Sequence, residues 1–401
     1  MSLYGTMRTG VSGMNAQSNR LSTVADNIAN SSTVGYKKAS VQFSSMILPA
    51  TNGAYNSGGV ETDVRYSISS QGTFSYTTST TDLAINGDGF FIVKGDDGTP
   101  YMTRAGSFVL QEDGTLKNTA GYTLQGYEYD STADPTIVVN GFDGLEPVDL
   151  SGSGISAVAS TTGALNVNLP NSLAVGEQKT TSLKVYDSQG TSRLITFTYE
   201  KLADNQWEVS AVEADGGTTV VTPTLLEFDT NGNLINPVPE QLDILTYNIA
   251  GATVENITLD IGNTTQLASD FSVEEGEVNG NAASKVKGYE IDDKGIVSIA
   301  YENGDLVPKF RVALASVQSP DNLNPVAGNM YTQSNDSGVV ILGYAGSSGF
   351  GTILSGALED SNVDVAEELT AMIESQRNYT ANSKVFQTGS ELMEVLVNLK
   401  R

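Results

Sequence analysis

MRTGVSGMNAQSNRLSTVADNIAN, residues 7–30, repeats a largely apolar position at alternating intervals of four and three residues. VAEELTAMIESQRNYTANSKVF, residues 365–386, repeats the same spacing near the other end of the chain. This heptad spacing predicts helices with a narrow apolar seam, which a partner helix buries. We therefore expect a coiled-coil-like terminal helical domain made of residues 1–30 and 363–401. Its seam, which we also expect to contact neighbouring subunits, contains Met7, Val11, Met14, Leu21, Ile28, Val365, Leu369, Met372, Tyr379 and Phe386.

The spacing leaves an alternative open, in which two ordinary amphipathic helices cap a globular domain. The length of the helices favours the first interpretation. A helix of about 30 residues spans about 45 Å, which is too long to tuck against a small domain.

Between the two ends, turn dipeptides such as Asn86-Gly87 and Asp113-Gly114 separate short apolar segments such as Phe90–Val93. This pattern is typical of β-hairpins, and it resumes at Gly288. We expect a linker with short strands over 31–69 and a discontinuous middle β domain over 70–145 and 285–362. Residues 146–284 would form a second β domain, inserted in the first. The predicted fold class is α+β, with long terminal helices and two mainly antiparallel β domains.

The charge of the chain is strongly negative. The 401 residues carry a formal net charge of −26. In the predicted insert, 19 acidic residues stand against 4 basic ones, and no Lys or Arg occurs from Leu202 to Ser284. Unpaired carboxylates are rarely buried, so we expect this insert to face water as an outer domain. The charge also disfavours nucleic acid and anionic membrane surfaces, and we predict neither as a partner.

The absence of cysteine and histidine limits the chemistry of the chain. It excludes disulfides, Cys and His nucleophiles, and zinc sites built from these residues. Asp229, Asn231, Asn233 and Glu240 have the spacing of an EF-hand loop, but Leu234 stands where that loop needs glycine. A hairpin turn explains the same residues, with calcium as the minor alternative. We predict no enzymatic activity, no cofactor and no metal.

The first 30 residues contain no apolar core followed by a small-residue cleavage site, which predicts that the chain has no Sec signal peptide.

Four blocks of sequence resemble the signatures of the bacterial flagellar rod and hook proteins. They are Asn27–Lys37, Asp82–Phe91, Tyr101–Phe108, and the segment that begins at Ser361 and includes Gln376-Arg377. The matching residues that we expect to be functional are Asn27, Asn30, Gly35, Tyr36, Asn86, Gly87, Gly89, Phe90, Arg104, Gly106, Asn362, Asp364, Gln376 and Arg377.

The resemblance implies a structural subunit that polymerises into a curved helical tube. The long acidic insert, together with Val185–Gly190, resembles the hook branch of the family more than the distal rod branch. The tube would be the extracellular flagellar hook, a flexible universal joint that passes motor torque from rod to filament. The terminal helices would line its channel, the middle β domain would form the next layer, and the insert would face outward.

The resemblance also implies partners. They are further copies of the chain, the distal rod protein, the hook cap, the hook–filament junction protein and the flagellar type III export apparatus, which would export the chain without a cleaved signal. Two alternatives remain, a distal rod protein and a secreted β-domain adhesin. An adhesin would not need heptad seams at both ends.

Overall fold

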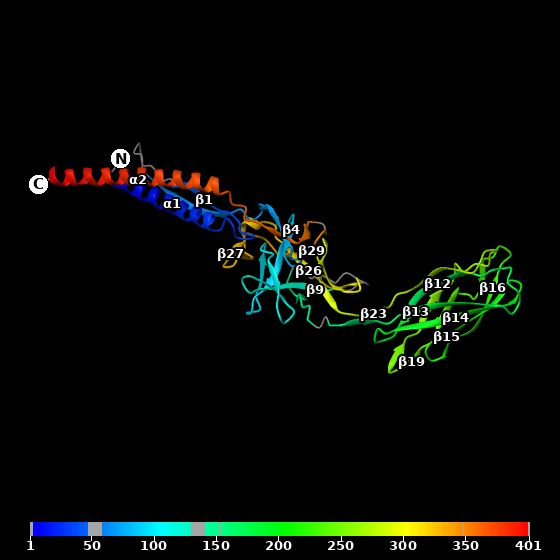
Figure 1. Ribbon diagram of the computed structural model, residues 1–401. Helices are drawn as coiled ribbons and strands as arrows, with labels where there is room; N and C mark the ends of the chain where they lie inside the picture. Colours follow the sequence, from blue (N-terminus) through cyan, green and yellow to red (C-terminus); the bar gives the residue numbers. More distant parts are fainter. Residues whose placement is uncertain (1–2, 47–57, 130–140, 152–153, 348, 400–401) are drawn as a thin grey trace. The chain divides into compact units, whose positions relative to one another are not determined.

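The computed structural model describes residues 3–46, 58–129, 141–151, 154–347 and 349–399 (Figure 1). The fold is α+β, with a helix near each terminus and mainly antiparallel sheets between them. The chain divides into two compact units. Unit 1 comprises Met1–Gly152, Gly288–Ala300 and Leu306–Arg401, and unit 2 comprises Ser153–Lys287 and Tyr301–Asp305.

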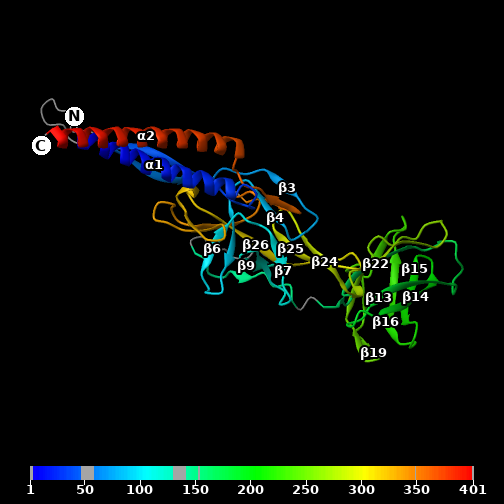
Figure 2. The ribbon, with the colours of Figure 1, turned by 60° about the vertical axis from the view of Figure 1, so that its left-hand side comes forward.

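The two helices belong to unit 1. α1 (Leu3–Ala29) and α2 (Val365–Leu399) lie side by side and run in opposite directions (Figures 1 and 2). Asp364 caps α2, because its Oδ1 accepts the backbone N–H groups of Ala366 at 2.8 Å and Glu367 at 3.2 Å. Within the described residues, neither helix combines the length and apolar content that crossing a membrane requires.

A two-stranded hairpin lies against α1. β1 (Ala39–Met46) pairs with β2 (Gly59–Tyr66) in antiparallel register, so that Ala39 faces Tyr66. Ser12 on α1 holds the hairpin, since its Oγ accepts the Val60 N–H at 2.8 Å and donates to the Val60 carbonyl at 3.0 Å.

The largest sheet of unit 1 has twelve strands. Its main order is β24-β25-β26-β9-β5-β6-β28-β27, and β7, β8, β10 and β29 pair along it. The bounds are β5 (Phe90–Lys94), β6 (Pro100–Thr103), β7 (Phe108–Leu110), β8 (Leu116–Asn118), β9 (Thr123–Glu128), β10 (Glu146–Pro147), β24 (Val286–Ile291), β25 (Ile296–Tyr301), β26 (Leu306–Ser316), β27 (Asn324–Val326), β28 (Met330–Thr332) and β29 (Ile341–Tyr344), with the 3₁₀ helix η1 (Pro320–Asn322) before β27.

Strand β5 is buried on both faces, which explains its continuous apolar sequence. Phe91 and Val93 enter one hydrophobic cluster, while Phe90 and Ile92 enter a second one. Successive side chains of a strand point to opposite faces, so the sheet separates two cores. β26 repeats this arrangement, with Val312 and Leu314 in the first cluster and Ala313 and Ala315 in the second.

Two smaller strand pairs join distant parts of unit 1. β3 (Phe74–Tyr76) pairs with β31 (Ala357–Glu359), and β4 (Leu83–Asn86) pairs with β30 (Thr352–Ser355). These pairs bring the segment before α2 next to the segment that follows β2, and so they place Glu359 near the N-terminal part of unit 1.

Unit 2 has two main sheets that share one hydrophobic core. Trp207, Phe197 and Leu259 are among its buried residues. One sheet has the order β13-β14-β15-β16-β17 and the other β18-β21-β12-β22. The bounds are β11 (Ser156–Val158), β12 (Thr162–Asn168), β13 (Gln178–Tyr186), β14 (Ser192–Ala203), β15 (Gln206–Glu213), β16 (Thr219–Phe228), β17 (Leu234–Asn236), β18 (Gln241–Ile244), β19 (Tyr247–Ile249), β20 (Ala252–Val254), β21 (Ile257–Asp260), β22 (Ser272–Val278) and β23 (Asn281–Ser284).

The core of unit 2 also holds a cation. Lys201 is 4% exposed, and its Nζ donates to the carbonyls of Asn171 at 2.6 Å and Leu173 at 2.9 Å. The same Nζ lies 6.0 Å from the centre of the Trp207 ring. These contacts replace the water that the ammonium group would otherwise bind.

Residues 146–151, at the start of the predicted insert, lie in unit 1. β10 pairs with β9, and Val148 and Leu150 are buried in the first hydrophobic cluster of unit 1. The charge pattern assigned these two apolar side chains to the acidic insert, because Glu146 and Asp149 flank Val148.

Candidate functional site: a polar junction and a helix pair

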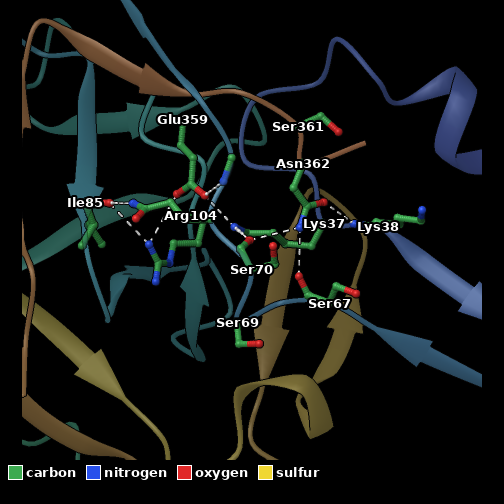
Figure 3. A network of polar contacts seen from close by, with 12 residues as sticks. Lys37, Lys38, Ser67, Ser69, Ser70, Ile85, Arg104, Glu359, Ser361 and Asn362 are labelled. Carbon is green, nitrogen blue, oxygen red and sulfur yellow. Dashed lines mark hydrogen bonds and ion pairs between the residues drawn. The ribbon is translucent and has the colours of Figure 1, made fainter. Parts of the chain in front are cut away.

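The first candidate site is a buried polar junction in unit 1, centred on Glu359 (Figure 3). Glu359 is 0% exposed. Its Oε1 lies 2.5 Å from the Nζ of Lys37 and accepts the Gly72 N–H at 2.9 Å, and its Oε2 lies 3.4 Å from a guanidinium nitrogen of Arg104. The junction therefore joins the segment after α1, the segment before β7 and the strand before α2.

The charges of the junction depend on one another. Burial lowers the pKa of the Lys37 ammonium and of the Arg104 guanidinium, while Glu359 opposes both shifts. Two cations thus share one buried carboxylate. Further contacts compensate them, because Lys37 donates to the Ser70 carbonyl at 2.6 Å and the Arg104 guanidinium lies 5.1 Å from the centre of the Phe90 ring.

Asn362 extends the junction toward β1. Its Oδ1 accepts the backbone N–H of Lys38 at 2.7 Å, and its Nδ2 donates to the carbonyls of Ser67 at 3.0 Å and Ser70 at 3.1 Å. The Lys38 side chain pairs with Glu367 at 3.0 Å and Glu368 at 2.8 Å, at the start of α2. The loop after α1 is therefore tied to both ends of the turn into α2.

Asn27 makes the matching connection on α1. Its Oδ1 accepts the Ala39 N–H at 3.0 Å and the Tyr36 hydroxyl at 3.2 Å. Its Nδ2 donates to the Ala39 carbonyl at 2.7 Å and to Glu368 at 3.1 Å. One buried amide thereby contacts α1, β1 and α2.

Two glycines allow the close approach that the junction needs. Gly35 has φ +67°, and a Cβ there would lie 2.6 Å from the backbone N of Ala105. A Cβ at Gly106 would overlap the carbonyl oxygen of Leu83. A larger residue at Gly35 would push the N-terminal loop away from Arg104 and Ala105, and one at Gly106 would push this segment away from Leu83.

The structure brings together about half of the residues that the resemblance singled out. Asn27, Gly35, Tyr36, Phe90, Arg104, Gly106 and Asn362 lie in or against the junction. Asn86, Gly87 and Gly89 form the turn between β4 and β5 instead, where both glycines have positive φ. Asn30 closes the end of α1 and Asp364 caps α2, while Gln376 and Arg377 are exposed on α2.

The second candidate site is the helix pair, which is held by small and polar residues. On α2, the positions that face α1 include Glu368, Ser375, Asn382 and Gly389, each seven residues after the last. A Cβ on Gly10 would lie 3.3 Å from the Asn382 carbonyl oxygen, and a Cβ on Gly389 would lie 2.7 Å from the Cγ of Met7. The two backbones therefore approach closely.

The predicted seam lies beside this contact line rather than on it. Met7, Met14, Leu21, Ile28 and Met372 are half-buried, and Met7 and Phe386 reach the opposite helix. Val11, Val365, Leu369, Tyr379 and Phe386 are 37–48% exposed. Within the described part of one chain, much of the apolar seam remains uncovered.

Glu359, Lys38, Glu368 and the small residues of the helix contact are not among the site residues predicted from the sequence. A signal for the small residues existed, since Gly10 and Gly13 in α1 and Gly389 in α2 interrupt otherwise helical patterns. Glu359 carried a weaker signal, as the first of two acids, with Asp360, that follow Ile353–Leu358. Its partners could not be found from spacing, because Lys37 lies 322 positions away.

The described residues contain no group of three or more acidic side chains arranged to hold a metal ion. Asp229, a residue of the EF-hand-like spacing, instead accepts the N–H groups of Asn231 and Asn233, both at 2.8 Å, in the turn between β16 and β17.

Four family models match the chain. They are "Flagella basal body rod protein" at residues 7–37, "Flagellar hook protein FlgE/F/G D1 domain" at 84–187, "Flagellar basal body protein FlaE D2 domain" at 170–281 and "Flagellar basal body rod FlgEFG protein C-terminal" at 354–399.

Relatives match over the whole chain. The flagellar hook protein FlgE of Rhizobium meliloti (strain 1021) is 61% identical over 406 residues, covering 100% of both chains. The FlgE of Brucella suis is 48% identical over the same coverage, and that of Escherichia coli (strain K12) is 31% identical over 97% of this chain and 98% of the relative. The fold is similar to the crystal structure of Helicobacter pylori flagellar hook protein FlgE2, with a TM-score of 0.53 and 15% identity over 70% of this chain and 98% of that one.

Proposed function

Because the chain belongs to the flagellar hook protein FlgE family, and is a structural subunit of the bacterial flagellar hook rather than an enzyme, we propose that its two terminal helices drive its polymerisation. The observation that supports this proposal is the exposed seam. Val365, Leu369 and Tyr379 are each more than 40% exposed along one helix. Burying apolar surface stabilises an assembly by about 25 cal/mol per Å².

The proposed polymer is a curved tube that works as a universal joint. The helical domain, 1–30 and 363–401, lines the channel in a coiled-coil-like arrangement. Residues 31–69 link it to a middle β domain of 70–145 and 285–362, and the inserted acidic domain, predicted as 146–284, faces outward. The net charge of that segment supports the outward placement, because solvated acidic surfaces make weak, screened contacts that can slide.

The proposed partners are further copies of the chain, the distal rod protein, the hook cap and the hook–filament junction protein. Export through the flagellar type III apparatus, without a cleaved signal, completes the proposal. Its support is the relationship to the flagellar hook proteins.

Substitution of a residue in the seam tests whether the terminal helices drive polymerisation. Leu369→Asp should block the polymerisation that salt induces in the purified chain, because it would place an unpaired charge in a packed interface. Thr370→Asp is the matched control, since Thr370 is exposed on α2 but lies outside the predicted seam. Electron microscopy and sedimentation measure the polymer. Normal polymerisation of the Leu369→Asp chain would show that the seam is not an intersubunit surface.

A further inference from the structure

The C-terminal end of α2 extends past the described part of α1. Met7 lies opposite Gly389, α1 begins four residues before Met7, and α2 continues ten residues beyond Gly389. About six residues of α2, or about 9 Å, therefore have no described part of α1 beside them. We call residues 391–398 the tip. Its exposed apolar side chains are Leu392, Val395, Leu396 and Val397, at 49–61% exposure.

A groove of about 490 Å³ lies along the first half of α1. Hairpin strand β2 forms one of its walls through Val60 and Thr62, and Phe386 of α2 contributes to another. The apolar lining comes mainly from Tyr4, Met7, Val11, Ala16, Val60 and Phe386. Its volume leaves room for several aliphatic side chains.

The charges of the tip and the groove are complementary. Arg8 is an exposed cation in the groove lining, and no carboxylate oxygen of the described residues lies within 4 Å of its guanidinium group. The tip carries Glu391 and Glu394, which are exposed and likewise form no ion pair within the described chain. Leu392, Val395 and Leu396 are spaced to share one face of the helix. Glu391 borders this face, about a quarter turn from its centre, whereas Glu394 lies toward the opposite side of the helix.

The tip cannot fill the groove of its own chain. α2 is a continuous helix from Phe386, which lines the groove, to the tip. A helix does not fold back on itself within three turns, so the tip points away from the groove that it would fit. The occupant with the matching chemistry is the tip of a second copy.

We propose that the tip of one subunit binds in the α1–β2 groove of a neighbouring subunit, with Glu391 beside Arg8. This inference rests on the proposed polymerisation and names two surfaces that carry it. Groove and tip are different patches of the same chain, so the contact is heterologous. Contacts of this kind build open helical polymers when the rotation between subunits does not close a ring.

Cysteine cross-linking tests the contact directly, because the chain contains no cysteine of its own. The double variant Val11→Cys, Leu396→Cys is polymerised, oxidised with a copper catalyst and run on a non-reducing gel. We expect a ladder of covalent oligomers from the polymer and single chains from the unpolymerised sample. The control pairs Val11→Cys with Thr370→Cys, which is exposed on α2 outside the tip, and should give no ladder.

A charge exchange provides the second measurement. Arg8→Glu should raise the critical concentration for polymerisation on the order of threefold to tenfold, and adding Glu391→Arg should restore most of the loss. Polymers without a Val11–Leu396 ladder, a ladder equally strong in the control, or no restoration would each overturn the tip–groove contact and leave polymerisation standing. If the unsubstituted chain does not polymerise, both proposals fail.

Discussion

At the scale of single residues, Glu359 connects separate segments of unit 1 through a buried carboxylate. It is the carboxylate that Lys37 and Arg104 share, and all three side chains are buried. Removing one partner of a buried ion pair leaves an uncompensated charge, which costs more than the pair itself contributes.

Glu359→Gln should therefore lower the free energy of unfolding of unit 1 by about 3 kcal/mol. Calorimetry measures this change, while fluorescence of Trp207, the only tryptophan, follows unit 2 separately and should not change. Glu367→Gln is the control, because Glu367 is an exposed acid whose ion pair with Lys38 does not involve Glu359. An unchanged unfolding transition for unit 1 would mean that the junction charges are not compensated by Glu359.

The raised pKa of Tyr247 predicts how the stability of unit 2 changes at alkaline pH. Burial, and then the negative charge of Glu213, raise the pKa of its hydroxyl to about 12. The folded state therefore holds this proton more tightly than the unfolded state. The resulting stability is fully present below the ordinary tyrosine pKa, near 10, and is lost as pH rises toward 12.

Tyr247→Phe should accordingly weaken the loss of unit 2 stability between pH 10 and pH 12, as followed by Trp207 fluorescence in urea. At pH 7 the variant should be as stable as the natural chain, because the Tyr247 hydroxyl has no hydrogen-bond partner among the described residues. Tyr186→Phe controls for the loss of a half-buried hydroxyl from the same unit. The same alkaline loss in both variants would contradict this assignment.

At the scale of elements, the helix pair shows which features the sequence could predict and which it could not. Heptad spacing located both helices, and turn dipeptides located the hairpin strands around Phe90–Val93. The spacing also selected the large apolar side chains, whereas the contact within one chain uses Gly10, Asn382 and Gly389. Hydrophobic periodicity identifies the apolar face of a helix, but it does not identify the element or subunit that packs against that face. The role of the small residues, which is to allow two helices to approach closely, becomes visible only in the three-dimensional structure.

Gly10→Leu separates helix propensity from helix pairing. Leucine favours an isolated helix by about 1 kcal/mol over glycine, so circular dichroism of the unassembled chain should show no loss of helix. The added side chain would meet the backbone of α2 at Asn382 and Phe386, and overpacking of this kind costs about 1–3 kcal/mol.

The critical concentration for polymerisation should then rise about tenfold. Ser22→Leu is the control on the same helix, because Ser22 is exposed and leucine there also favours helix. Equal effects of the two substitutions would argue that Gly10 does not set the distance between the helices.

At the scale of the whole molecule, the limits of the two units decide which deletions can be tolerated. Charge and turn patterns favoured an insert of 146–284, but they could not show that Val148 and Leu150 are buried in the core of unit 1. That information depends on long-range contacts, such as the pairing of β10 with β9.

Deleting 153–287 should leave a chain that folds and polymerises into a thinner tube, because unit 1 retains its cores and both helices. Deleting 146–284 should instead destabilise unit 1 by several kcal/mol through the loss of two buried side chains, on the order of 2–5 kcal/mol each. Thermal melting and electron microscopy of both chains measure the difference. Failure of the first deletion to polymerise while folded would show that unit 2 carries essential contacts.

The distribution of basic residues in unit 2 has a consequence for proteolysis. Trypsin cuts after lysine and arginine, and from Leu202 to Ser284 the sequence offers neither. Lys201, just before this stretch, is 4% exposed and held by two carbonyls, so the protease cannot reach it in the folded chain. Arg8, Arg377 and Lys384 are exposed on the helices. A brief digest of free subunits should therefore trim the terminal helices and leave residues 202–284 uncut. In subunits that have been incorporated into the polymer, the three helix sites should be protected from the protease.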